Sequence, residues 1–278
     1  MTTMPDVTSP AEQDFRSSVE VGDVTWRRVA ASEWVKLRSL RSSWLTMGIA
    51  VAALVGIAVV GGILTNQDWS HMRPQRRANF QPIDASLTGV AFAQLAIGVL
   101  GVLFISGEYG TGMIRSTLGA VPRRLPVLWA KLAVFGAVSL VLMEISAFLA
   151  FFLGQAALGS HGTSISAPGA LRAVIGTGLY LTGVGLLGVA LGFLIRITAG
   201  GIAALVGLLL LLPGIMNILP QSWQDTVTPY LPSSAGGAVY QIRVDPGTLA
   251  PWTGFGVFCL YVVVAIVVAA FFLRRRDA

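Results

Sequence analysis

The sequence predicts an all-α integral membrane protein with six transmembrane helices and an N-terminal helix in the membrane interface. Of its 278 residues, 54% are hydrophobic and only 12% are charged, and the mean hydropathy is +0.74. A soluble globular domain carries about 25% charged residues, so this chain would leave apolar surface exposed in water. It also contains six apolar stretches whose lengths are close to the roughly 20 residues that a spanning helix needs. The bilayer is therefore its expected solvent.

The N-terminal region divides into a polar tail and a basic segment rich in tryptophan. Residues Met1–Asp23 have no apolar stretch, which predicts a disordered cytoplasmic tail rather than a signal peptide. In Val24–Trp44, apolar residues recur on one side of a helical wheel, interrupted by Glu33 and Arg41. This pattern predicts an amphipathic helix lying in the membrane interface. The alternative is a basic flank that only orients the first span.

The expected transmembrane domain is 45–273, and 274–278 follows it as a cytoplasmic C-terminus. Its predicted spans are residues 45–64, 85–106, 127–153, 171–195, 199–219 and 252–273. The fourth span carries Gly188 and Gly192 at a spacing that favours close helix contact. In the fifth, Pro213 and Gly214 are expected to kink the helix.

Lys and Arg residues gather at alternate ends of the spans, which predicts the orientation. Basic residues precede the first span, follow the second, separate the fourth from the fifth at Arg196, and end the chain at residues 274–276. With six spans these positions share one side, and the positive-inside rule makes that side cytoplasmic. We therefore expect a multi-pass plasma membrane protein with both termini in the cytoplasm. The basic cluster Arg73, Arg76 and Arg77 falls in an outer loop, and its role stays open.

Two polar side chains inside predicted spans are candidates for a substrate path or gate. Glu144 is the only acidic residue deep in a span, and Gln94 is the notable polar residue of the second span. A charge at the bilayer centre costs roughly 2.5–3.5 kcal/mol on insertion scales, so something should offset it. The structural alternative is a carboxyl group hydrogen-bonded to Gln94 or Ser146, or turned towards the outer interface.

The motifs of several catalytic classes are absent from the sequence. It has no GxxxxGK[ST] phosphate loop, no HExxH zinc site and no GxSxG nucleophile elbow. The histidines, His71 and His161, fall in predicted outer loops, far from any nucleophile at membrane depth. The single cysteine, Cys259, lies in an apolar run, as a small buried hydrophobe would. We therefore expect no enzyme, no metal site and no nucleic-acid partner.

The segment Gly107–Lys131, GEYGTGMIRSTLGAVPRRLPVLWAK, is a basic island between two uncharged runs. Its glycines permit sharp turns, and Pro126 is suited to open the next helix. Such an island predicts a short, structured cytoplasmic loop. We interpret it as the surface that meets a soluble partner, and we expect Lys131 to extend towards the lipid headgroups.

This segment resembles the region after the second span of ABC-2-type transporter permeases, particularly the actinobacterial ones. The shared pattern is an acidic residue, a glycine turn, Arg-Ser-Thr-Leu, Pro-Arg-Arg and a Lys at the start of the third span. The stretches SEWVKLRSLRSSW and TPYLPSSAGGAV resemble the family's N-terminal elbow helix and the outer loop between its last two spans. The resemblance implies that this outer loop, residues 220–251, dips back as short re-entrant helices that close the exit.

The resemblance implies the membrane-spanning permease subunit of an ATP-binding cassette exporter of the type V architecture. Two permease chains, identical or paralogous, would pair in the lipid, each with one cytoplasmic ATPase subunit that binds ATP and Mg²⁺. This chain would bind no cofactor itself. A coupling helix at about 107–124 would contact the ATPase through Glu108, Arg115, Arg123 and Arg124. Drug-like, lipid-like or peptide cargo would be exported; the alternative is a membrane sensor or regulatory module with an ATPase partner.

Overall fold

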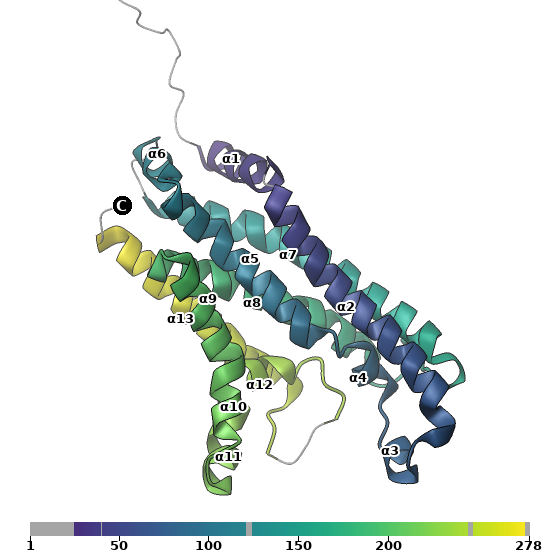
Figure 1. The fold of residues 1–278 in the computed structure, drawn as a ribbon. Coiled ribbons are helices and arrows are strands. Elements are labelled where there is room, and N and C mark those ends of the chain that lie inside the picture. The colour runs from purple at the N-terminus through teal and green to yellow at the C-terminus, as the bar shows by residue number, and fades with distance from the viewer. Residues whose placement is uncertain (1–24, 40, 121–123, 244–246, 276–278) are drawn as a thin grey trace, which may run out of the picture.

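The computed structural model describes residues 25–39, 41–120, 124–243 and 247–275, which form helices and turns without a strand (Figure 1). The longer helices are α1 (Trp26–Ser39), α2 (Arg41–Asp68), α5 (Val90–Gly110), α6 (Met113–Ala120), α7 (Arg124–Leu158), α8 (Ala170–Ile195), α9 (Thr198–Val206) and α13 (Pro251–Arg275). The shorter ones are α3 (Pro74–Ala78), α4 (Pro82–Ser86), α10 (Leu212–Met216), α11 (Gln221–Val227) and α12 (Pro232–Gly237), with 3₁₀ turns η1 (Trp69–His71), η2 (Gly159–His161) and η4 (Thr228–Tyr230).

Six helical segments of the described chain are long and apolar enough to cross a membrane. They are Arg41–His71, Pro82–Gly110, Leu125–His161, Ala170–Ile195, Thr198–Met216 and Pro251–Arg275. The all-helical, six-span prediction is confirmed at this level. In Figure 1, α1, α6 and the C-terminal end of α13 lie at one end of the bundle, whereas α3 and α11 lie at the other. We call these the α1 end and the α11 end.

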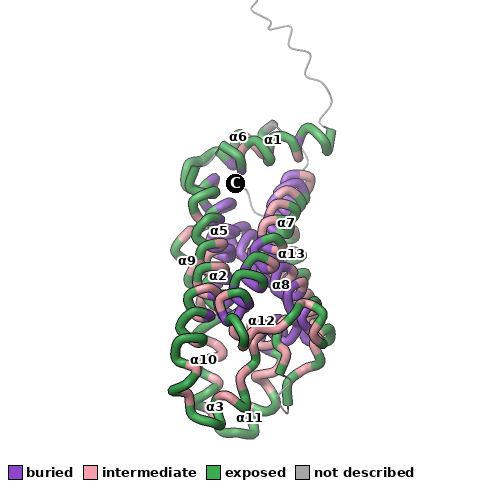
Figure 2. The backbone as a smooth tube through the Cα atoms, turned by 90° about the vertical axis from the view of Figure 1, so that its right-hand side faces the viewer, coloured by how far each residue is buried: buried purple, intermediate pink, exposed green. Residues whose placement is uncertain are grey.

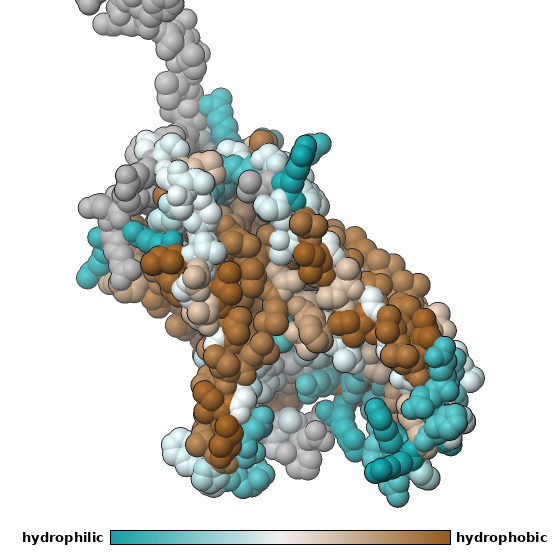
Figure 3. Space-filling model, viewed as in Figure 1, coloured by the Kyte–Doolittle hydropathy of each residue, from teal (hydrophilic) through white to brown (hydrophobic). Residues whose placement is uncertain are grey.

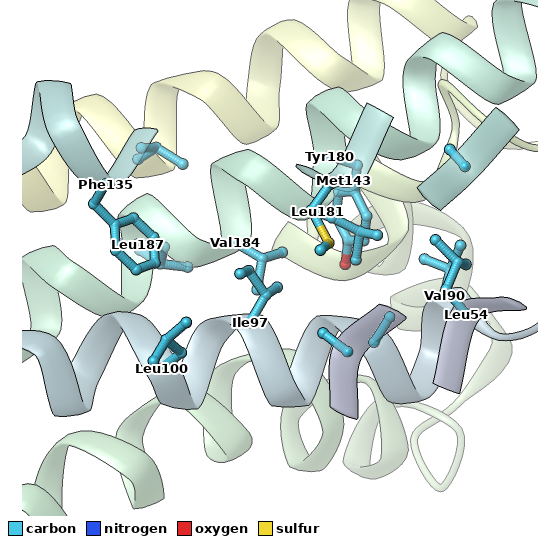
Figure 4. Packing of buried hydrophobic residues seen from close by; sticks show 14 of the residues in the cluster. Leu54, Val90, Ile97, Leu100, Phe135, Met143, Tyr180, Leu181, Val184 and Leu187 are labelled. Carbon is cyan, nitrogen blue, oxygen red and sulfur yellow. The ribbon is translucent and has the colours of Figure 1, made fainter. Parts of the chain in front are cut away.

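Helices α5 and α8 form the centre of the bundle, and the other spans pack around them. About two thirds of each of these spans is buried, 61% and 67%, against 17% to 33% for the other four. Buried residues accordingly follow the middle of the bundle in Figure 2. Figure 4 shows Ile97 and Leu100 of α5 facing Val184 and Leu187 of α8, with Phe135 of α7 beside them. These apolar contacts fix the spans against one another.

Glycines allow α5 and α8 to approach closely. A Cβ at Gly101 would overlap the carbonyl oxygen of Gly185, and a Cβ at Gly188 would overlap that of Gly98. At Gly192, an added Cβ would lie 2.9 Å from the Cβ of Ile105. The small residues of the fourth span therefore serve helix packing, as their spacing predicts.

Several helix boundaries differ from the sequence-based spans. The first span begins at Arg41, the second is split into α4 and α5, and α7 begins at Arg124, before Pro126. Proline is tolerated there because the first N–H groups of a helix have no intrahelical partner. The fifth span contains a π-helical segment, Gly207–Leu211, immediately before α10. Pro213 has no N–H for the carbonyl four residues earlier, which accounts for the irregular turn.

The short helix α12 is inserted among the spans at the α11 end. It is packed against α13 and α8, and Ala235, Gly236 and Gly237 are buried. A Cβ at Gly236 would lie 2.6 Å from Cδ2 of Tyr180. Because Tyr180 is ten residues into α8, α12 reaches about 15 Å along that helix.

On the face shown in Figure 3, apolar residues cover the middle of the bundle and continue along α10, whereas polar residues gather towards the two ends. Exposed apolar side chains lie on all the outer spans, among them Val60, Leu149, Leu211 and Val267. Such a band is what lipid tails would contact in a spanning bundle.

Candidate functional site

The inward face of α1 carries a carboxylate between two apolar residues. Val29, Glu33 and Leu37 recur every four residues and are the buried residues of this helix. Val29 packs against Val127 and Ala130 of α7. Glu33 shares the inward face of α1 with Val29 and Leu37. The packing that buries these two residues therefore also directs the Glu33 side chain into the bundle. The tryptophans of α1 are instead partly exposed.

Lys131 of α7 lies opposite Glu33 and connects it to α5. Its Nζ donates to Oε2 of Glu33 at 2.5 Å and to Oε1 of Glu108 at 2.6 Å. The side chains of Lys131 and Glu33 are 0% exposed, and that of Glu108 is 6% exposed. The ammonium group also lies 4.9 Å from the ring centroid of Phe104, a favourable cation–π position. Lys131 therefore points into the protein. The prediction that it extends towards the lipid headgroups is wrong.

A second lysine extends this ion pair to α6. Lys36 Nζ donates to Glu33 Oε1 at 2.8 Å and lies 3.4 Å from Glu108 Oε1. It also donates to the hydroxyl of Thr117 on α6 at 3.1 Å. We call Glu33, Lys36, Glu108 and Lys131 the four-charge cluster; it contains two acids and two bases.

The four-charge cluster joins four helices at the α1 end. Glu33 and Lys36 come from α1, Glu108 from the last turn of α5, and Lys131 from the second turn of α7, while Thr117 adds α6. Removing one partner of a buried ion pair typically costs 3–5 kcal/mol, because a charge is left uncompensated. The formal charges within the cluster balance, so moving one of these helices away would leave a buried charge uncompensated, which favours this arrangement of the helices.

Of the four residues expected to contact a partner, only Glu108 has a side chain within the described part of the structure. Glu108 is directed into the cluster, so its carboxylate is not part of the outer surface. Arg115 lies on α6 and Arg124 begins α7, but their side chains are outside the described residues, as is the whole of Arg123. On α6, Ile114 is buried, whereas Met113 is 39% exposed. One side of α6 thus faces the bundle and another is exposed.

The two polar candidates inside the spans do not meet each other. Gln94 accepts a hydrogen bond through Oε1 from the hydroxyl of Tyr180 at 2.6 Å. Ser146 donates to the carbonyl of Leu142 in its own helix. Glu144 contacts Gly178 of α8, and within the described part of the chain its Oε2 is buried without a hydrogen-bond partner. The hydrogen bond from Gln94 or Ser146 to the Glu144 carboxyl group, the structural alternative suggested by the sequence, is therefore not formed.

A second polar group at the α11 end was not expected from the sequence. Arg172, near the start of α8, donates from Nη1 to the carbonyl of Val239 at 2.7 Å and from Nη2 to that of Gln241 at 3.1 Å. Asp84 of α4 accepts from the backbone N–H of Ile242 at 3.0 Å. These bonds attach the segment after α12 to two spans. In the sequence, Arg172 was only a basic residue at the end of a span, and nothing predicted its hydrogen bonds to the segment after α12.

No protein-family model matches this chain, and no curated protein matches it. The described residues therefore define the class directly: an all-helical, multi-pass membrane protein with a buried ion cluster at one end and an inserted short helix towards the other.

Proposed function

We propose that this chain is the membrane-spanning permease subunit of an ATP-binding cassette exporter, driven by a separate cytoplasmic ATPase. The observation that carries the proposal is the four-charge cluster. It links α6, a short, partly exposed helix, to α1 and to the adjoining ends of the second and third spans. A force applied to α6 would therefore move several helices together.

The α1 end would face the cytoplasm in this proposal. It carries most of the basic residues in the described part of the chain, including Arg27 and Arg28 on α1 and Arg274 and Arg275 on α13. The positive-inside rule favours the cytoplasm for this end. Nucleotide-driven closure of two ATPase subunits would then displace α6, and α5 and α7 would follow as rigid bodies.

Cargo would pass between two copies of this chain or between it and a paralogue. The outer spans expose apolar side chains, which suits drug-like or lipid-like cargo. The inserted helix α12, held against Tyr180, would close the path at the far side. ATP and Mg²⁺ would be bound by the ATPase.

The proposal is tested by reconstituting the chain in lipid nanodiscs and in liposomes with a candidate ATP-binding cassette ATPase. We expect a stable complex, ATP hydrolysis stimulated by cargo, and ATP-dependent movement of that cargo. Arg115→Glu on α6 should weaken ATPase binding at least ten-fold, while Arg73→Glu near α3 serves as a matched control. An ATPase that binds without any cargo movement would favour a sensor, and cargo transport by this chain alone would refute the proposal.

A further inference from the structure

A carboxyl group lies within the spans without a charged partner. Glu144 belongs to α7, thirteen residues from Lys131, or about 20 Å along the helix. Within the described part of the chain its Oε2 is buried and has no hydrogen-bond partner, and no ion pair to Glu144 is formed. Such a group in apolar surroundings calls for a proton or a cation from outside the chain.

The neighbouring helix is shaped to accommodate this carboxyl group. A Cβ at Gly178 of α8 would lie 2.6 Å from Oε1 and 2.7 Å from Oε2 of Glu144. Only a residue without a side chain leaves that space free. The threonines on either side of Gly178 in α8 do not supply a partner, because Thr177 and Thr182 donate to carbonyls of their own helix.

Glu144 lies at the edge of the bundle: the residue is only partly buried, although its Oε2 is enclosed near Gly178. Met143, one residue earlier, is buried beside Tyr180 and Leu181 (Figure 4). Successive residues of a helix are turned by about 100°, so the Glu144 side chain leaves α7 to one side of that core contact and reaches α8 at Gly178. Its neighbours on α7, Val141 and Ile145, are 61% and 54% exposed. On a spanning helix, such exposed apolar side chains face lipid tails.

From this geometry we propose that Glu144 and Gly178 form a binding site for a lipophilic organic cation that enters from the bilayer. The carboxylate would pair with the cationic centre, and the exposed apolar side chains of α7 would contact its hydrocarbon body. Charge would decide the selectivity, because a lipophilic anion of the same shape would be repelled. The site belongs to this chain alone and does not depend on an ATPase.

The test compares two probes that differ in charge and not in shape, tetraphenylphosphonium and tetraphenylborate. Their binding is measured by equilibrium dialysis with the full chain in nanodiscs of zwitterionic lipid, corrected with empty nanodiscs. We expect saturable binding of the cation only. Glu144→Gln should raise its Kd at least ten-fold, and Gly178→Ala should raise it by a smaller factor because the new Cβ displaces the carboxyl group. Asp225→Asn, which removes an exposed acid of α11, should leave the Kd within two-fold.

A second measurement needs no variant and therefore does not depend on variant folding. The hydrophobic reagent dicyclohexylcarbodiimide adds to carboxyl groups that are reached from an apolar phase. We expect mass spectrometry to find the adduct on Glu144, and tetraphenylphosphonium, but not tetraphenylborate, to suppress it. Equal binding of both probes, an unchanged Kd in a folded Glu144→Gln variant, or labelling that the cation does not suppress would overturn the proposal.

Discussion

The ammonium nitrogen of Lys131 lies 2.5 Å from Oε2 of Glu33, although 98 residues separate the two in the sequence. Both side chains are fully buried. An ion pair in such surroundings is a weak source of net stability but a strict determinant of geometry, because each charge requires the other. The position of α1 on the bundle is therefore set by charge as well as by apolar contact.

This relationship predicts non-additive stability changes. Lys131→Met leaves Glu33 and Glu108 with one lysine between them and should lower the free energy of unfolding by about 3–5 kcal/mol. Glu33→Gln should cost less, because Lys131 keeps Glu108 at 2.6 Å. In the double variant Lys36 and Glu108 balance each other, so the combined loss should fall short of the sum by about 1–3 kcal/mol. Chemical unfolding in detergent measures each value.

The matched control for this cycle is Arg73→Met, which removes an exposed cation near α3 and should change stability by less than about 0.5 kcal/mol. Strictly additive losses for Glu33 and Lys131 would mean that the pair does not couple α1 to α7.

A second prediction concerns the attachment of α6. Lys36 donates to the hydroxyl of Thr117, which itself donates to the carbonyl of Met113. Thr117→Val keeps the shape of the side chain but removes both bonds, so α6 should open more often. We expect amide hydrogen exchange in α6 to quicken about five-fold or more, a loss of roughly 1 kcal/mol. Exchange in α8 should not change.

Ser116→Ala is the appropriate comparison, because Ser116 also donates to the carbonyl of Met113 but makes no contact with α1 among the described hydrogen bonds. If both variants accelerated exchange in α6 equally, the bond from Lys36 would have no special role.

The sequence predicted the spans well because hydropathy over about 20 residues is a property of each segment alone. It also indicated that residues 107–131 form a charged segment between two apolar spans. It did not predict the four-charge cluster, since Glu33 and Lys131 meet only after α1 folds against α7. The one local signal was a carboxylate on the apolar side of a helix, between Val29 and Leu37. A charge placed so usually has a buried partner.

The irregular parts of the fold were harder to predict for a related reason. The break between α4 and α5 and the insertion of α12 are stabilised by contacts between distant segments, such as Gly236 with Tyr180. Such long-range contacts leave no periodic pattern in the sequence, and short helices within residues 220–251 were expected only from the family resemblance. Pro213 did indicate an irregular fifth span, because the loss of a backbone donor is local.

A third prediction concerns the buried hydrogen bond between Tyr180 and Gln94. Tyr180→Phe removes the donor and leaves Gln94 Oε1 unpaired, so it should lower the free energy of unfolding by about 1–3 kcal/mol. Gln94→Leu should have a similar effect by leaving the tyrosine hydroxyl without its acceptor. The double variant replaces both partners by apolar groups and should recover most of the loss. Thermal unfolding of the unmodified protein, the two single variants and the double variant completes the cycle. A double variant whose loss of stability equals the sum of the two single losses would contradict this prediction.

The last prediction concerns the bonds between Arg172 and the segment after α12. Its planar guanidinium group reaches the carbonyls of Val239 and Gln241 together, which a lysine could not do with the same geometry. Val239 is 0% exposed, so a cysteine at that position reports opening. In a Cys259→Ala background, Val239→Cys should react slowly with a water-soluble maleimide. Arg172→Met should raise the rate about ten-fold, because two charge-assisted bonds of roughly 1.5–3 kcal/mol each are lost and repacking recovers part. Arg172→Lys should give an intermediate rate, and a rate unchanged by either variant would show that this segment is held by apolar packing alone.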